Sequence, residues 1–231
     1  MTEFFRYPHT PHIAWLGDGE PRDDKVMSQA EVNAILADAV VVEEKLDGAN
    51  LGFSLGEEGV LKAQNRGQYL AEPHAGQFAR LPAWLTQHSE SMRAFLKPNL
   101  IFFGEWCAAR HSLDYVALPD WFLLFDVYDR SAERFWSTPR RNALASEAGL
   151  VTVPQVLQGT TTVPALKQLV AATPSRYRLG ALEGVVIRRE SDEWCEARAK
   201  LVRPDFTQSI DTHWRKRPIE WNRIDCSIEA L

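Results

Sequence analysis

The stretch 39–55 constrains the fold of this chain more than any other. Two β-prone runs, 39–42 and 51–55, flank a charged segment that contains Lys45, Asp47 and Gly48. An Asp-Gly pair between two such runs is typical of a hairpin-like turn, with Lys45 at a strand end and Gly48 free to adopt a conformation that other residues avoid. A lysine held there can act as a nucleophile when its pKa falls or when an anionic substrate uses its charge. The same residues also fit a surface lysine beside an ordinary turn.

Composition limits the classes of protein that this chain can belong to. Its 231 residues are 45% hydrophobic, which suffices for one good core or for a large domain with a small appendage. The formal net charge is −5, so any nucleic-acid affinity must come from a local basic surface. Cys107, Cys195 and Cys226 are far apart and form no Cys-x-x-Cys pair, which predicts a reduced, cytoplasmic protein without a zinc ribbon or disulfide framework. The N-terminus lacks the apolar core of a signal peptide, and no apolar run suits a membrane helix.

Helix signals recur along the chain. Ser28 and Glu31 form a capping box that predicts a short helix through Ala37. Ser137 before Thr-Pro predicts a hydroxyl-capped helix that stops at Gly149. Apolar spacing and end signals together predict later helices over 77–87, 90–96, 138–148 and 163–172.

Strand signals alternate with these helices, and several predicted strands carry charge. A carboxylate inside a β-prone run is costly unless it has a partner or faces a cavity. By the period-two rule, a strand over 198–202 presents Arg198 and Lys200 on one face. The other charged strands are 60–65, which delivers Arg66 at its end, 99–107 with Glu105, 121–128 with Asp126 and 183–188 with Glu183.

The tail from Pro204 is basic and aromatic, and two interpretations of it stay open. It is either a nucleic-acid contact or a C-terminal helix docked by its tryptophans with a solvated basic face. No Walker or dinucleotide-type glycine loop occurs, so if this protein handles phosphate, it does so with side-chain cations. The residues in question are Trp214, Arg215, Lys216, Arg217, Trp221 and Arg223.

In this order, the pieces resemble the covalent nucleotidyltransferase superfamily of ligases and mRNA capping enzymes. They are most similar to ATP-dependent RNA ligases of the branch that joins 5′-phosphate and 3′-hydroxyl ends on duplex RNA. The resemblance covers residues 40–202, and five or six motifs in order make it specific. The matching pieces are Glu44-Lys45-Leu46-Asp47-Gly48-Ala49-Asn50, Arg66-Gly67, Phe103-Gly104-Glu105-Trp106, Phe122-Leu123-Leu124-Phe125-Asp126-Val127, Glu183-Gly184-Val185-Val186-Ile187 and Arg198-Ala199-Lys200.

The resemblance implies an α+β fold. Residues 1–203 would form an adenylyltransferase (nucleotidyltransferase) domain of ligase type, with antiparallel sheets flanked by helices and a nucleotide cleft between the sheets. Residues 204–231 would form a short basic, aromatic helical tail without an OB-fold. The implied reaction has three steps: Lys45 takes AMP from ATP, AMP passes to an RNA 5′-phosphate, and a 3′-hydroxyl displaces AMP.

The resemblance also implies roles for individual residues. Lys45 would be the nucleophile, and Glu183 would bind Mg²⁺ or Mn²⁺, since Mg²⁺ prefers carboxylates, water and phosphate. Glu105 would bind the ribose, and Phe125 would stack on adenine, although a lone apolar aromatic also fits the core. Nearby cations would lower the pKa of Lys45 and neutralise the phosphates. The remaining implied site residues are Glu44, whose main chain contacts adenine, Asp47 and Asn50, which serve the later steps, and the cations Arg66, Arg198 and Lys200.

Two departures from the family and two alternatives bear on this hypothesis. Arg198 replaces a usual lysine, and only 31 residues follow Lys200, so RNA contact must rely on the catalytic domain, the tail or a protein partner. Lys-x-Asp-Gly is shared with DNA ligases, which makes a minimal DNA ligase one alternative; Asn50 and the missing OB-fold favour RNA. A non-catalytic nucleic-acid-binding module of the same fold is the other, and the intact lysine and carboxylates argue against it.

Overall fold

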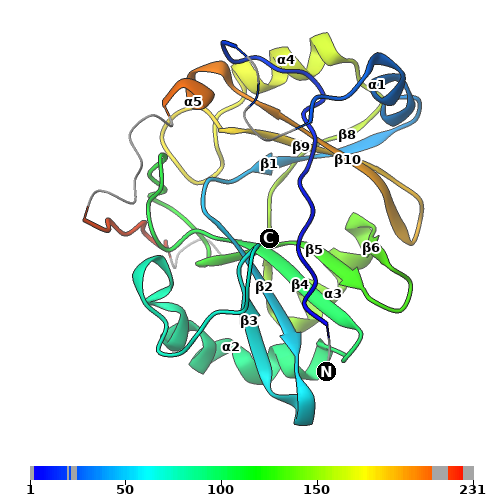
Figure 1. Ribbon diagram of the computed structural model, residues 1–231. Coiled ribbons are helices and arrows are strands. Elements are labelled where there is room, and N and C mark those ends of the chain that lie inside the picture. The colour runs from blue at the N-terminus through cyan, green and yellow to red at the C-terminus, as the bar shows by residue number, and fades with distance from the viewer. Residues whose placement is uncertain (1–2, 20, 22–24, 210–217, 226–231) are drawn as a thin grey trace.

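The computed structural model describes residues 3–19, 21, 25–209 and 218–225. Helices and strands alternate over this part of the chain (Figure 1). The α-helices are α1 Gln29–Ile35, α2 Leu81–Phe95, α3 Thr138–Ala148, α4 Val163–Ala172 and α5 Pro204–Ser209, with 3₁₀ turns at Glu57–Gly59 and Gly76–Phe78. The strands are β1 Val40–Lys45, β2 Ala49–Leu55, β3 Leu61–Gln64, β4 Leu100–Trp106, β5 Phe122–Asp129, β6 Arg134–Trp136, β7 Val151–Thr152, β8 Gln155–Gly159, β9 Gly184–Glu190 and β10 Trp194–Val202.

Ten strands of the described chain form one connected sheet. Nine of them follow the order β3-β2-β4-β5-β6-β10-β9-β1-β8 with antiparallel neighbours, and β7 pairs in parallel with β5. The short strand β6 joins the two halves, because it pairs through two residues with β5 and through two with β10. The α+β class and the antiparallel architecture predicted from the sequence are confirmed; the predicted separate sheets are two halves of one.

Each half of the sheet buries one face under two helices. The half β3-β2-β4-β5 packs residues such as Phe53 and Phe102 against Trp84 of α2 and against α3. The half β10-β9-β1-β8 packs Ile187 against Leu166 of α4 and against α1 (Figure 1). The opposite faces of the two halves are therefore left to form a cleft.

The N-terminal segment runs across both halves of the sheet (Figure 1). At one end, the Gln64 side chain donates to the carbonyl of Phe5 at 2.8 Å. At the other end, the main chain of Lys200 on β10 forms two hydrogen bonds. Its N–H donates to the carbonyl of Pro11 and its carbonyl accepts from the N–H of Ile13, both at 2.9 Å. These contacts cover the edge of β10 that β6 leaves open.

The predicted helices are largely confirmed, with differences at their ends. Ser28 and Glu31 form both hydrogen bonds of the capping box, and Gly149 ends α3 in the left-handed conformation. Helices predicted over 77–87 and 90–96 are one helix, α2, preceded by a 3₁₀ turn. The hydroxyl cap at Ser137 is wrong: its Oγ donates to the carbonyl of Asp192, and the Glu190 carboxylate caps the first turn instead.

The predicted hairpin around Asp47 is wrong. β1 pairs with β8 and β9, whereas β2 pairs with β3 and β4, so the Asp-Gly segment connects the two halves of the sheet. The reason for Gly48 also differs from the prediction. A Cβ there would lie 2.5 Å from the carbonyl oxygen of Trp106, so close approach of the backbone requires glycine, and not a positive φ.

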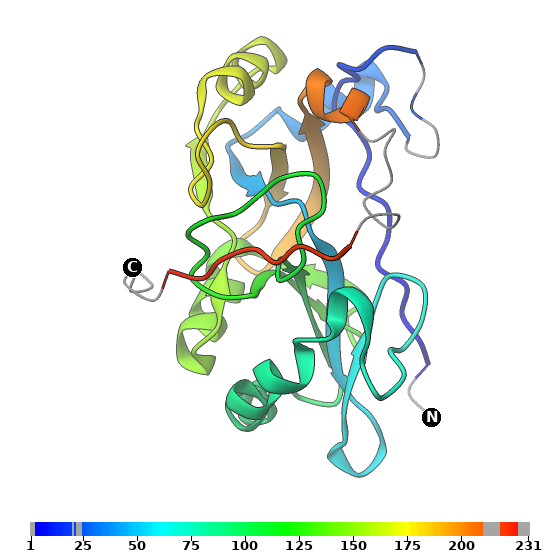
Figure 2. The same ribbon diagram turned by 90° about the vertical axis from the view of Figure 1, so that its left-hand side faces the viewer.

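The described part of the tail is mostly extended. α5 is a short helix, but residues 218–225 cross the surface as an extended segment, the red trace in Figure 2. Trp221 bridges to Ala109 and Ile224 to Leu118, and the Trp221 ring packs on Arg80 at 4.3 Å. Helical structure is therefore wrong for 218–225, where Trp221 is half-buried and packs against the core. Trp214, Arg215, Lys216 and Arg217 lie outside the described residues. None of the described helices is long and apolar enough to span a membrane.

Candidate active site

A cavity of about 600 Å³ lies between the two halves of the sheet. Seven of the ten predicted site residues line it: Glu44, Lys45, Asn50, Arg66, Glu105, Phe125 and Lys200. Asp47, Glu183 and Arg198 do not line it. Residues that the sequence analysis did not single out also contribute: Tyr7, Thr10, Glu43, Gln77, His111 and Arg188.

Lys45 is the last residue of β1, a strand that pairs with β8 up to Glu43 and with β9 up to Lys45 itself. It lies opposite Gly184 in the β1–β9 register, which brings the preceding Glu183 beside it. Lys45 Nζ donates to Glu183 Oε1 at 2.6 Å; the lysine side chain is 28% exposed and the glutamate side chain 3%. The lysine thus reaches the cavity while its partner is buried behind it.

The charge around Lys45 is the reverse of the predicted one. Burial opposes the charged amine, yet the carboxylates of Glu183, Glu105 and Asp47 raise the pKa of Lys45 above its ordinary value. Burial also raises the pKa of Glu105 to about 7 and that of Glu183 to about 8, although the Lys45 charge works in the other direction. The expectation that nearby cationic side chains lower the pKa of Lys45 is therefore wrong.

Glu105 faces the nucleophile from the other half of the sheet. It lies on β4 opposite Asn50 on β2, and its Oε1 accepts the N–H of Gly48 at 3.0 Å. Asn50 Oδ1 is buried and has no hydrogen-bond partner among the described residues. An unpaired buried acceptor beside a cavity is suited to a ligand that donates a hydrogen bond.

Asp47 is held away from the cavity by a distant loop. Its Oδ2 accepts the main-chain N–H groups of Ser112 and Leu113, each at 2.7 Å, and its own N–H donates to the Tyr115 hydroxyl at 2.8 Å. These bonds fix the chain between Lys45 and β2. The neighbouring His111 lies in the same loop, lines the cavity and contacts the Gln77 side chain at 2.8 Å.

Glu44 is fixed by both its main chain and its side chain. Its N–H donates to the carbonyl of Pro154 at 2.8 Å, so that group is not available for the predicted contact with adenine. Its carboxylate accepts from Ser175 Oγ at 2.5 Å and from the N–H of Arg176 at 3.0 Å. Burial raises the pKa of Glu44 despite these bonds.

Lys200 and Arg66 supply positive charge to the cavity. Lys200 is held through its main chain by the N-terminal segment. Arg66 follows β3 in a turn where the Asn65 side chain accepts the N–H groups of Gly67 and Gln68 at 2.8 and 2.9 Å. Arg66 Nε is buried without a hydrogen-bond partner in the part of the chain that the structure describes, so it can bind an anion.

Arg198 is used inside the protein. Its guanidinium pairs with Asp126, donates to the Tyr7 hydroxyl at 2.5 Å and lies 3.9 Å from the centre of the Phe135 ring. Asp126 also pairs with Arg188 at 2.7 Å. Two of the residues that the sequence analysis missed could have been found in the sequence. Glu43 and Arg188 are charged residues in β-prone strands, the same pattern that identified Glu105 as a candidate. Arg141 lies in a helix, where a charged residue is ordinary, so no such pattern identifies it.

A divalent cation fits this site only with help from a ligand. Glu183 Oε2 is buried and has no partner among the described residues, as a metal ligand requires. Over the same residues, no group of three or more His, Cys, Asp or Glu side chains could hold a metal ion by itself. Mg²⁺ commonly binds through one or two carboxylates together with substrate phosphates and water, and this donor set fits that pattern.

Solved structures show which class of protein has this fold. An RNA ligase from Naegleria gruberi with PPi matches with a TM-score of 0.61 and 16% identity, over 90% of this chain and 64% of that one. Point mutants of the same ligase match with a TM-score of 0.60 and 16% identity. The one with ATP and Mn covers 79% of this chain and 55% of that one, and the one with AMP and Mn covers 90% and 64%. The fold is that of the ligase-type nucleotidyltransferase domain.

The sequence itself defines the family. The model of the RNA ligase family matches residues 38–202, most of the chain, so the protein belongs to the RNA ligase family, as its motifs predicted. No curated protein matches it. The chain spans 55% to 64% of the length of the three solved ligase structures described above.

Proposed function

We propose that this protein is an ATP-dependent RNA ligase that joins 5′-phosphate and 3′-hydroxyl ends through a covalent lysyl-AMP intermediate. The observation that carries the proposal is the position of Lys45. It ends a strand that is paired on both sides, reaches the cavity and contacts Glu183, while Glu105, Arg66 and Lys200 line the space around it.

The first step makes one bond and breaks one. The Nζ–phosphorus bond forms as the bond from the α-phosphorus to the pyrophosphate oxygen breaks, so Nζ must first lose its proton. The surrounding carboxylates raise the pKa of Lys45 and so oppose this loss. Binding of the nucleotide together with its cation must therefore lower the pKa of Lys45. Glu183 Oε2 would hold the divalent cation, which when bound would neutralise Glu183 and the phosphate oxygens and thereby lower the pKa of Lys45.

The remaining side chains bind and orient the substrate. Phe125 would stack on the base, Glu105 would bind the ribose, and Arg66 and Lys200 would neutralise charge at the transferred phosphate. Asn50, whose Oδ1 has no partner in the described chain, would act in the later steps near the acceptor end. Asp47 contributes by anchoring the chain after Lys45 to the loop that carries His111.

The proposed substrate is tested by comparing ligation of RNA and DNA that carry the same ends. Purified protein with ATP and Mg²⁺ is given nicked duplex RNA, nicked duplex DNA and single-stranded RNA, each with 5′-phosphate and 3′-hydroxyl ends. The proposal expects sealing of the RNA nick at a rate well above that of the DNA nick. Faster sealing of DNA would show a DNA ligase, and a protein that binds RNA but seals no end would show a binding module.

A further inference from the structure

Phe125 occupies an irregular position on β5. The pairing of β5 with β4 passes from Leu124 to Asp126 without using Phe125, which defines a β-bulge. Leu124 and Val127 both pack in the core under α2 and α3, whereas Phe125 and Asp126, adjacent in sequence, both line the cavity. A regular strand would send two adjacent side chains to opposite faces. The bulge is therefore what lets Phe125 and Asp126 face the cavity side by side, and it sets how the Phe125 ring enters it.

The carbonyl of the bulged residue is bound by arginines. Arg141 Nη1 donates to the Phe125 carbonyl oxygen at 2.5 Å, and Arg188 Nη1 donates to it at 3.3 Å. Both guanidinium groups are buried, with side-chain exposures of 0% and 1%. These two bonds tie the carbonyl of the bulged residue to buried side chains on α3 and β9, and so they stabilise the bulge.

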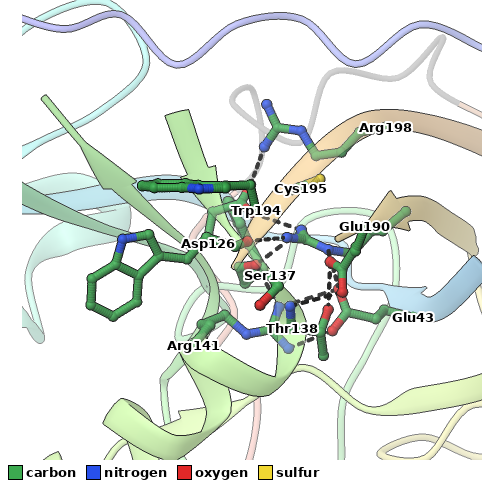
Figure 3. A network of polar contacts seen from close by, with 12 residues as sticks. Glu43, Asp126, Ser137, Thr138, Arg141, Glu190, Trp194, Cys195 and Arg198 are labelled. Carbon is green, nitrogen blue, oxygen red and sulfur yellow. Dashed lines mark hydrogen bonds and ion pairs between the residues drawn. The ribbon is translucent and has the colours of Figure 1, made fainter. Parts of the chain in front are cut away.

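Arg141 also connects the bulge to the strand that carries the nucleophile. From α3, its Nη2 donates to Glu43 Oε1 at 2.5 Å and its Nη1 to Oε2 at 3.2 Å (Figure 3). Asn142 Oδ1 accepts from the Nε and Nη2 of Arg141 at 3.0 and 2.7 Å. Glu43 lies on β1, two residues before Lys45. One planar guanidinium thus spans a carboxylate on one half of the sheet and a carbonyl on the other, which an ammonium group cannot do.

We propose that Arg141 is a positioning residue that holds the Phe125 bulge and so fixes the ring against which the nucleobase stacks. This inference rests on the proposed function, in which Phe125 contacts the base of ATP. Arg141 does not line the cavity, so it acts through Phe125 and Glu43. Its loss should weaken the binding of ligands that carry a base and spare ligands that do not.

The test compares two probes by calorimetry, AMP and inorganic pyrophosphate, with full-length protein. Arg141→Lys should weaken AMP binding about tenfold, since base–aromatic stacks contribute on that order or more, and leave pyrophosphate binding unchanged. Asn142→Ala, a milder change at a residue outside the cavity, should weaken AMP binding about two- to threefold. Arg140→Lys is the matched control. The Arg140 side chain, next in sequence to Arg141, packs over Trp136 and pairs with Glu193, so both affinities should stay as in the wild type.

A double-mutant cycle separates positioning from general damage to the fold. In a Phe125→Leu background, Arg141→Lys should have little further effect on AMP binding, because the ring through which it acts is absent. The proposal is overturned if Arg141→Lys lowers only the melting temperature, if it weakens AMP and pyrophosphate equally, if its effect adds in full to that of Phe125→Leu, or if the wild type does not bind AMP. These affinities need no chemistry, so a failure to form the lysyl-AMP adduct would reject the proposed function and leave this test intact.

Discussion

Two clusters of charged residues lie beside the cleft and differ in how completely their polar atoms are paired. The arginine cluster consists of Glu43, Asp126, Arg141, Arg188, Glu190 and Arg198, and part of it is drawn in Figure 3. The lysine cluster consists of Lys45, Asp47, Glu105 and Glu183. In the arginine cluster, the single side chain of Arg188 makes three hydrogen bonds. It donates to Glu190 at 2.6 Å, to Asp126 at 2.7 Å and to the carbonyl of Trp136 at 3.0 Å. In the lysine cluster, by contrast, Glu183 Oε2 has no partner in the described part of the chain.

The pKa shifts of the carboxylates follow the same difference. Although burial opposes it, the charges of Arg198 and Arg188 lower the pKa of Asp126. Burial raises the pKa of Glu105 to about 7 and that of Glu183 to about 8, because one lysine cannot compensate several carboxylates. A cluster of balanced charge joins the halves of the sheet, whereas a cluster with excess negative charge and unpaired atoms is suited to bind cations and substrate.

The largest effect is expected from breaking the arginine cluster. Arg188→Met leaves Asp126 and Glu190 buried with fewer partners and should lower the free energy of unfolding by about 3–5 kcal/mol, as denaturant titration would measure. Arg134→Met is the matched control, since Arg134 pairs with Glu196 at the surface, where such a pair contributes less than about 1 kcal/mol. Equal small losses in the two variants would mean that the network does not hold the halves together.

Glu183 should show the opposite behaviour, with activity lost and stability kept. Glu183→Ala removes the proposed metal ligand and should slow lysyl-AMP formation by about 100-fold, with only partial recovery at raised Mg²⁺. Its free energy of unfolding should stay near that of the wild type. Burying the Glu183 carboxylate costs free energy, and its removal offsets the loss of the contact with Lys45. Glu193→Ala, an exposed glutamate paired with Arg140, should leave the rate unchanged. Adenylylation at the wild-type rate in Glu183→Ala would exclude the role.

A smaller effect concerns the pH dependence of stability. The pKa of Glu105 is raised from 4.5 to about 7 in the folded protein, so between these values the folded state binds more protons than the unfolded state. Stability should therefore fall as pH rises from about 4.5 to about 7, by about 2–3 kcal/mol from this residue. Glu105→Gln should remove that part of the slope in urea titrations at pH 5, 6 and 7. An unchanged slope would show that Glu105 is ionised in the free protein.

Local features of the fold and site could be predicted from the sequence better than contacts between distant residues. The period-two pattern located the strands, and the rule that a carboxylate in a β-prone run needs a reason marked Glu105 and Asp126. Pairing between strands was less accessible. Asp47-Gly48 looks locally like a hairpin, but the Asp47 carboxylate binds the main chain of Ser112 and Leu113, 65 and 66 residues away.

Long-range polar contacts were the part that no local pattern could show. Arg141 lies in an ordinary helix, and its partner Glu43 is 98 residues away. β5 itself carries no glycine to mark the bulge at Phe125. The Phe-Asp pair gives a usable signal in retrospect, because two adjacent residues can both face one cavity only where the strand is irregular.

The most direct measurement is the transfer of label from α-labelled ATP to the protein in the presence of Mg²⁺, read on a denaturing gel. The wild type should acquire a covalent label, and peptide mapping should place it on Lys45. Folded Lys45→Ala should acquire none, while Lys25→Ala, which removes an exposed lysine paired with Glu31, should label as the wild type does. A label that persists in folded Lys45→Ala, or a wild type that binds ATP without acquiring a label, would contradict the assignment of Lys45 as the nucleophile.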